Sequence, residues 1–101
     1  MYIAMNRFHI VPGKEQEFID IWAKRETYLD QVPGFKQFDL LQGPGTDEYT
    51  LFASHSVWES VQSFENWTKS EAFKKAHANA GSTSKDIYLG RPVFEGFSSV
   101  L

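Results

Sequence analysis

The N-terminal segment alternates apolar and polar side chains as a half-buried strand does. The residues that share one face at this spacing are Tyr2, Ala4, Asn6, Phe8 and Ile10. A period of two predicts a β-strand over 2–10, which Pro12-Gly13 ends. The apolar face of this strand therefore includes one amide, that of Asn6.

The pattern of apolar positions predicts helices and strands along the rest of the chain. In order, these are a helix over 14–30, strands over 35–42 and 48–57 joined by a loop at 43–47, a helix over 59–67, a helix from the N-cap Ser70 to near Gly81, and a strand within 88–101 interrupted by Gly90, Pro92 and Gly96. The order β-α-β-β-α-β is typical of a ferredoxin-like α+β fold. Without an internal repeat or a linker, we expect one domain over 1–101.

A sheet with helices on one face leaves its other face to be covered. Pairing two copies through that face would give a homodimer, the dimeric α+β barrel. Aromatic residues make up 16% of the chain, with nine Phe and three Trp. Such rings fill a core, but they also suit a flat apolar ligand or a large subunit interface.

Charge and cysteine content exclude several classes of function. The net charge is -3 with no long basic run, which argues against nucleic acid as a partner. Cysteine is absent, so disulfides, a thiolate nucleophile and cysteine metal sites are excluded. No apolar stretch has the length of a membrane span, and no secretory signal pattern begins the chain, so we expect a cytoplasmic protein without a membrane partner.

Three residues carry candidate chemistry: Asn6, Trp67 and His77. On a helix, His77 shares a face with Phe73 four residues earlier, which places an imidazole on an apolar surface where it could ligate the metal of an apolar cofactor. A histidine near a helix end can also simply favour the helix dipole. Asn6 either bonds a neighbouring backbone group or donates to a ligand, and Trp67 either fills the core or covers a cofactor.

Several stretches resemble a known family. They are Ala4-Met5-Asn6-Arg7-Phe8, Val32-Pro33-Gly34-Phe35, Ser56-Val57-Trp58 and, most specifically, Trp67-Thr68-Lys69-Ser70-Glu71-Ala72-Phe73-Lys74-Lys75-Ala76-His77. The chain resembles dimeric α+β barrel proteins of the antibiotic-biosynthesis-monooxygenase type, and within them the IsdG-like haem-degrading monooxygenases. The resemblance implies that His77 is the axial ligand of haem iron, that Asn6 bonds on the distal oxygen side, and that Trp67 presses on the porphyrin. Phe73, on the face of His77, is expected to contact haem as well.

The implied activity is haem degradation, with haem as both substrate and cofactor. O2 and an external electron donor, either a reductase or a small reductant, would open the ring and release iron and a biliverdin-type tetrapyrrole. Arg7, Lys24 and Arg25 are candidates to meet the propionates. Two alternatives stay open: a cofactor-independent monooxygenase acting on a quinol or polyphenol, and a non-catalytic haem carrier.

Overall fold

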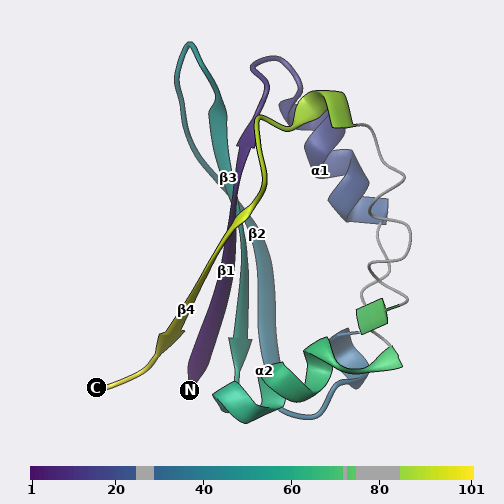
Figure 1. Ribbon diagram of the computed structural model, residues 1–101, viewed down its shortest axis with the longest axis vertical. Helices are drawn as coiled ribbons and strands as arrows, with labels where there is room; N and C mark the ends of the chain where they lie inside the picture. Colours follow the sequence, from purple (N-terminus) through teal and green to yellow (C-terminus); the bar gives the residue numbers. More distant parts are fainter. Residues whose placement is uncertain (25–28, 72, 75–84) are drawn as a thin grey trace.

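Four antiparallel strands form one sheet, with both α-helices on the same face (Figure 1). The computed structural model describes residues 1–24, 29–71, 73–74 and 85–101. The strands are β1 (Tyr2–Ile10), β2 (Phe35–Gly45), β3 (Thr50–Trp58) and β4 (Val93–Ser98), in the order β2-β3-β1-β4. This is the predicted ferredoxin-like arrangement, with β1 and β3 in the centre.

The first helix is shorter than the sequence predicts. α1 spans Glu15–Lys24, and a separate 3-10 turn, η1, covers Leu29–Gln31. The predicted end at residue 30 is therefore wrong. Residues 29 and 30 belong to this 3-10 turn and not to α1, and Val32, which precedes Pro33, is disfavoured in the helical region, so the turn is not extended. The Val32 N–H instead bonds the Leu29 carbonyl at 3.0 Å, which closes the short turn.

The second helix, α2 (Val61–Thr68), begins two residues later than predicted because Ser60 occupies its N-cap. The Ser60 hydroxyl accepts from the Ser63 N–H at 3.2 Å, satisfying one of the free donors at the helix start.

The β2–β3 hairpin turns later than the predicted loop at 43–47. β2 continues through Gly45, and the chain reverses over residues 46–49. The Thr46 N–H donates to the Tyr49 carbonyl at 2.7 Å, while the Thr46 hydroxyl accepts from the N–H groups of Glu48 and Tyr49. The pairing of β2 with β3 shifts register between Gln42 and Gly45. This irregularity accommodates Pro44, which has no backbone N–H to donate to the neighbouring strand.

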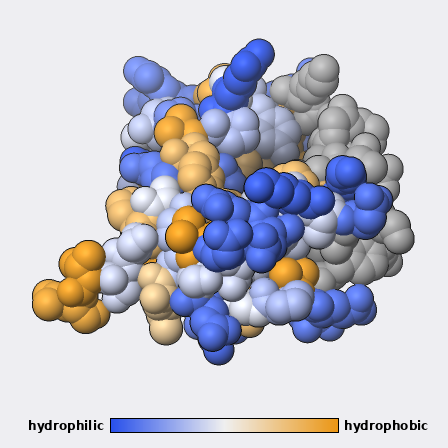
Figure 2. All heavy atoms as spheres, turned by 60° about the horizontal axis from the view of Figure 1, so that its bottom comes forward, coloured by the Kyte–Doolittle hydropathy of each residue, from blue (hydrophilic) through white to orange (hydrophobic). Residues whose placement is uncertain are grey.

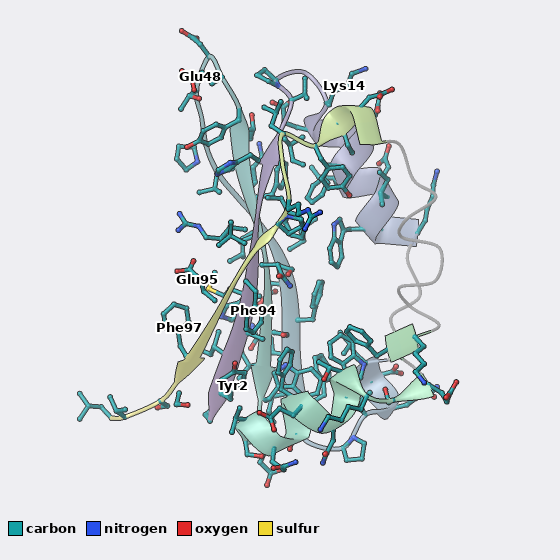
Figure 3. The ribbon with its side chains drawn as sticks, viewed as in Figure 1. Tyr2, Lys14, Glu48, Phe94, Glu95 and Phe97 are labelled. Carbon is teal, nitrogen blue, oxygen red and sulfur yellow. The ribbon has the colours of Figure 1, made fainter. Side chains whose placement is uncertain are left out.

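The helix side of the sheet holds two core clusters, one at each helix. The α1 cluster consists of Phe8, Ile10, Phe18, Phe52 and Ile87, and the α2 cluster consists of Tyr2, Ala4, Leu29 and Trp58. Half-buried aromatic rings extend both clusters, and one stacked pair, Trp22 and Phe38, lies between them with centroids 5.6 Å apart. The side chains drawn in Figure 3 gather accordingly at the two ends of the sheet's helix side.

The other side of the sheet is not covered by either helix, and we call it the open face. Its β1 residues are Ile3, Met5, Arg7 and His9, by alternation with the buried residues of the same strand. Large apolar side chains remain accessible there: Leu41 is 42% exposed, Val93 54% and Phe97 50%. Figure 2 shows mostly hydrophilic surface over the α2 end and apolar side chains projecting at the C-terminus, where Val100 and Leu101 are exposed. No helix in the described part of the chain is long and apolar enough to cross a bilayer.

Candidate functional site

A row of four side chains crosses the sheet between the two core clusters. Asn6 pairs with Ser54 of β3 on one side and with Phe94 of β4 on the other, and Ser54 pairs in turn with Leu40 of β2. Directly paired residues project to the same side of an antiparallel sheet, with Cβ atoms about 4.5–5.5 Å apart. Because Ala4 and Phe8 flank Asn6 on the buried side of β1, this central row faces the helices.

Asn6 is half-buried at the middle of the central row. Among the described residues its side-chain amide makes no hydrogen bond, although β3 and β4 pair the backbone of β1 on both edges. The interpretation in which Asn6 merely bonds a neighbouring backbone group therefore has no support in the described contacts. An accessible amide beside apolar side chains such as Phe94 is suited to meet a polar group on a ligand, because its N–H and C=O can both form hydrogen bonds.

Trp67 lies near the end of α2 and packs against the α2 cluster. Its ring centroid is 5.3 Å from that of Trp58 and 4.8 Å from that of Phe73, the latter at an interplanar angle of 87°. Trp58 is fully buried, as expected of a core residue, whereas Trp67 is half-buried. Trp67 thus lies at the boundary of the α2 cluster.

Ser70 connects the end of α2 with the following helical residues. Its hydroxyl donates to the Trp67 carbonyl at 2.6 Å and accepts from the Phe73 N–H at 3.1 Å. Ser70 is therefore the predicted N-cap, and it fixes Phe73 relative to Trp67. The structure thereby brings together two of the predicted haem contacts. His77, the predicted axial ligand, lies outside the described residues, and so does Arg25.

The remaining charged candidates lie elsewhere. Arg7 is on the open face, where it forms an ion pair with Glu95 at 3.4 Å, so it lies on the opposite side of the sheet from Asn6. The alternation of β1 already separates Arg7 from Asn6. His55 is also on that face, 3.9 Å from Asp39, and exposed His9 stacks on Tyr49 at 4.2 Å. Within the described ranges, no three His, Asp or Glu side chains form a metal cluster.

One carboxylate ties the start of α1 to the sheet. The buried Thr50 hydroxyl of β3 donates to Glu15 at 2.6 Å. This hydrogen bond, together with the backbone N–H groups of Glu15 itself and of Gly13, lowers the pKa of the Glu15 carboxyl below its ordinary value of 4.5. The contact fixes the position of α1 over the α1 cluster.

Sequence reasoning did not identify Ser54 and Phe94 as neighbours of Asn6. Ser54 is buried, and Phe94 is 49% exposed. Their positions depend on the register between strands far apart in the sequence. The sequence did predict that each residue lies on a β-strand. A strand assignment alone does not say which residue of another strand lies beside it, because that depends on the register.

The chain is similar to known proteins over most of its length. Residues 1–79 match the family described as antibiotic biosynthesis monooxygenase. A curated haem-degrading monooxygenase of Bacillus thuringiensis (strain Al Hakam) is 32% identical over 81 residues, which are 80% of this chain and 75% of the relative.

Two solved structures share the fold. The haem degrader MhuD of Mycobacterium tuberculosis, with two haems bound in its active site, matches with a TM-score of 0.74 at 25% identity, covering 100% of this chain and 97% of the other. A Bacillus cereus structure named after the antibiotic biosynthesis monooxygenases matches with a TM-score of 0.81 at 16% identity, covering 99% and 91% of the two chains.

Proposed function

The chain belongs to the antibiotic biosynthesis monooxygenase family, and from this membership we propose that it is a haem-degrading monooxygenase. It binds haem and opens the porphyrin oxidatively with O2 and electrons from an external donor, releasing iron and a biliverdin-type tetrapyrrole. The curated relative supports the substrate. The observation that carries the proposal is the central row, where the half-buried Asn6 amide lies between two aromatic clusters.

The chemistry of these residues fits haem. A porphyrin is flat and largely apolar, so it is suited to aromatic walls such as Trp67 and Phe73, whose rings meet edge to face at 4.8 Å. Its iron centre is polar, and hydrogen-bond donors nearby help to decide whether O2 is activated there. Asn6 offers such a donor, and among the described residues its amide has no competing side-chain hydrogen bond.

We assign the roles that the family resemblance implies. His77 would hold the haem iron, Asn6 would offer an N–H where O2 reacts, and Trp67 would press on the macrocycle. Haem, when bound, supplies the iron at which O2 and electrons react. The protein holds the porphyrin in place, keeps water away from it and presents one oriented N–H. Preorganised donors of this kind stabilise charge that develops during the reaction.

The protein acts as a homodimer in this proposal. The open face exposes Leu41 on one edge strand and Val93 and Phe97 on the other, and these large apolar side chains would be covered if a second copy packed against the face. The same face carries an ion pair between Arg7 and Glu95 and the close pair His55 and Asp39, so charged groups of both signs lie on it. A two-fold axis would bring the face against its own copy, where opposite charges can meet across the interface.

One titration tests the function against its alternatives. Haemin is added to the purified protein, the Soret band is followed, and ascorbate is then added under air. A band that forms and then decays supports the enzyme. A band that forms and persists indicates a haem carrier and contradicts degradation. No band indicates the cofactor-independent monooxygenase and contradicts haem binding altogether.

A further inference from the structure

We propose that Phe94 of β4 forms the apolar wall of the haem site at the edge of the sheet, beside Asn6. This inference rests on the proposed function, because it names a further residue that positions the same substrate. Nothing in the local sequence around Phe94 marks it as a ligand contact. Strand register, ring packing and exposure together place Phe94 at this site.

The register places Phe94 next to Asn6. The two residues are direct partners in the β1–β4 ladder, so both side chains leave the sheet on the helix side. Figure 3 shows Glu95 and Phe97 projecting away from the helices, while Phe94 lies on the opposite side of the strand. Of the six residues of β4, the helix-facing ones are Phe94, Gly96 and Ser98, so Phe94 alone carries a large apolar side chain there.

Ring packing holds Phe94 in one orientation. It stacks on Phe64 of α2 with centroids 5.7 Å apart and an interplanar angle of only 10°. Phe64 is fixed in turn by Trp58 at 5.6 Å and by Tyr2 at 5.5 Å. Tyr2 itself lies across Gly96, where any Cβ would collide with the phenol. Phe94 is therefore the outermost ring of an aromatic series that begins in the α2 cluster.

Half of the Phe94 surface nevertheless stays accessible, at 49% exposed. A fixed aromatic ring, half exposed and adjacent to the half-buried Asn6 amide, offers preorganised apolar surface at the rim of the candidate site. A flat apolar macrocycle placed over Asn6 would cover this ring, because the two side chains are direct neighbours on the helix side of the sheet. Covering such a ring contributes about tenfold to affinity, given the usual gain for apolar area removed from water.

The chain supplies a matched control for this contact. Phe97 lies on the same strand, is the same residue type and is 50% exposed, but it projects from the open face. Replacing either ring by alanine removes the same number of atoms from an edge strand. Only Phe94 adjoins Asn6, so the two variants separate a contact with substrate from a general effect on β4.

The experiment is a haemin titration of the full chain and of the variants Phe94→Ala, Phe94→Leu and Phe97→Ala, read from the Soret band and from tryptophan fluorescence quenching. We expect Phe94→Ala to raise the Kd for haemin about tenfold, Phe94→Leu to recover part of that loss, and Phe97→Ala to stay within about twofold of the parent chain. Light scattering on each sample reports any change in association separately.

Two results would overturn the inference while leaving the proposed function intact. One is a Phe94→Ala variant that binds haemin as the parent chain does. The other is an equal loss in Phe94→Ala and Phe97→Ala, which would show a general effect of truncating β4. Failure of the parent chain to bind haemin at all would instead refute the proposed function, and the Phe94 contact with it.

Discussion

Replacing Asn6 by alanine should separate haem binding from haem turnover. The substitution is mild for the fold, because the backbone of β1 is paired on both edges and the Asn6 side chain is only half-buried. Among the described residues no side-chain hydrogen bond is lost with it. We therefore expect the free energy of unfolding to change by less than about 1 kcal/mol, the span of strand preferences.

The effect on chemistry should be far larger than the effect on stability. Removing one preorganised hydrogen-bond donor from a reacting centre lowers the rate by about 10²–10³, or roughly 2.7–4 kcal/mol in the barrier. Haem affinity should stay near that of the parent chain, since the axial bond proposed for His77 and the apolar contacts of Trp67 and Phe73 remain. Asn6→Asp keeps the size of the side chain but loses its N–H, so it should fail in turnover as well.

The assay is a haemin titration followed by Soret decay under air with ascorbate or a reductase. Asn66→Ala serves as the control, because it removes the same amide from an exposed position on α2. The expected result is a normal Kd with a persistent Soret band for Asn6→Ala, and normal decay for Asn66→Ala. Turnover by Asn6→Ala at the parent rate would refute the donor role and leave Asn6 as an ordinary strand amide.

Three further outcomes are expected. His77→Ala should abolish or greatly weaken haemin binding with an unchanged circular dichroism spectrum, whereas an unchanged Soret position would contradict its role as ligand. Val93→Asp puts a charge on the open face and should convert the dimer to monomer by light scattering, and a monomeric parent chain would contradict the barrel. Glu15 has a lowered pKa in the folded state, so its contribution to stability is present above pH 4.5 and is lost as the pH falls through the folded value. Glu15→Gln should therefore be less stable than the parent chain in urea at pH 7, with the difference vanishing in acid, and a pH-independent difference would refute this linkage.

Local signals in the sequence were enough to predict much of the fold. The alternation from Tyr2 to Ile10 gave the first strand and put Asn6 on its buried side, as the structure confirms. Ser70 was predicted as an N-cap from its residue type and position, and its hydroxyl accepts from the Phe73 N–H. Both features depend on residues close together in the chain, so the physical forces that set them act within the segment itself.

What only the tertiary structure decided is which distant segments meet. Phe94 stands beside Asn6 because β4 pairs with β1, and Arg7 meets Glu95 on the opposite face for the same reason. The 3-10 turn over Leu29–Gln31 was missed because apolar spacing alone does not distinguish such a turn from the last turn of an α-helix. Periodicity records the environment that a residue needs, either buried or exposed. It does not record which partner supplies that environment, because strand pairing and register are selected by the packing of the whole sheet against its helices.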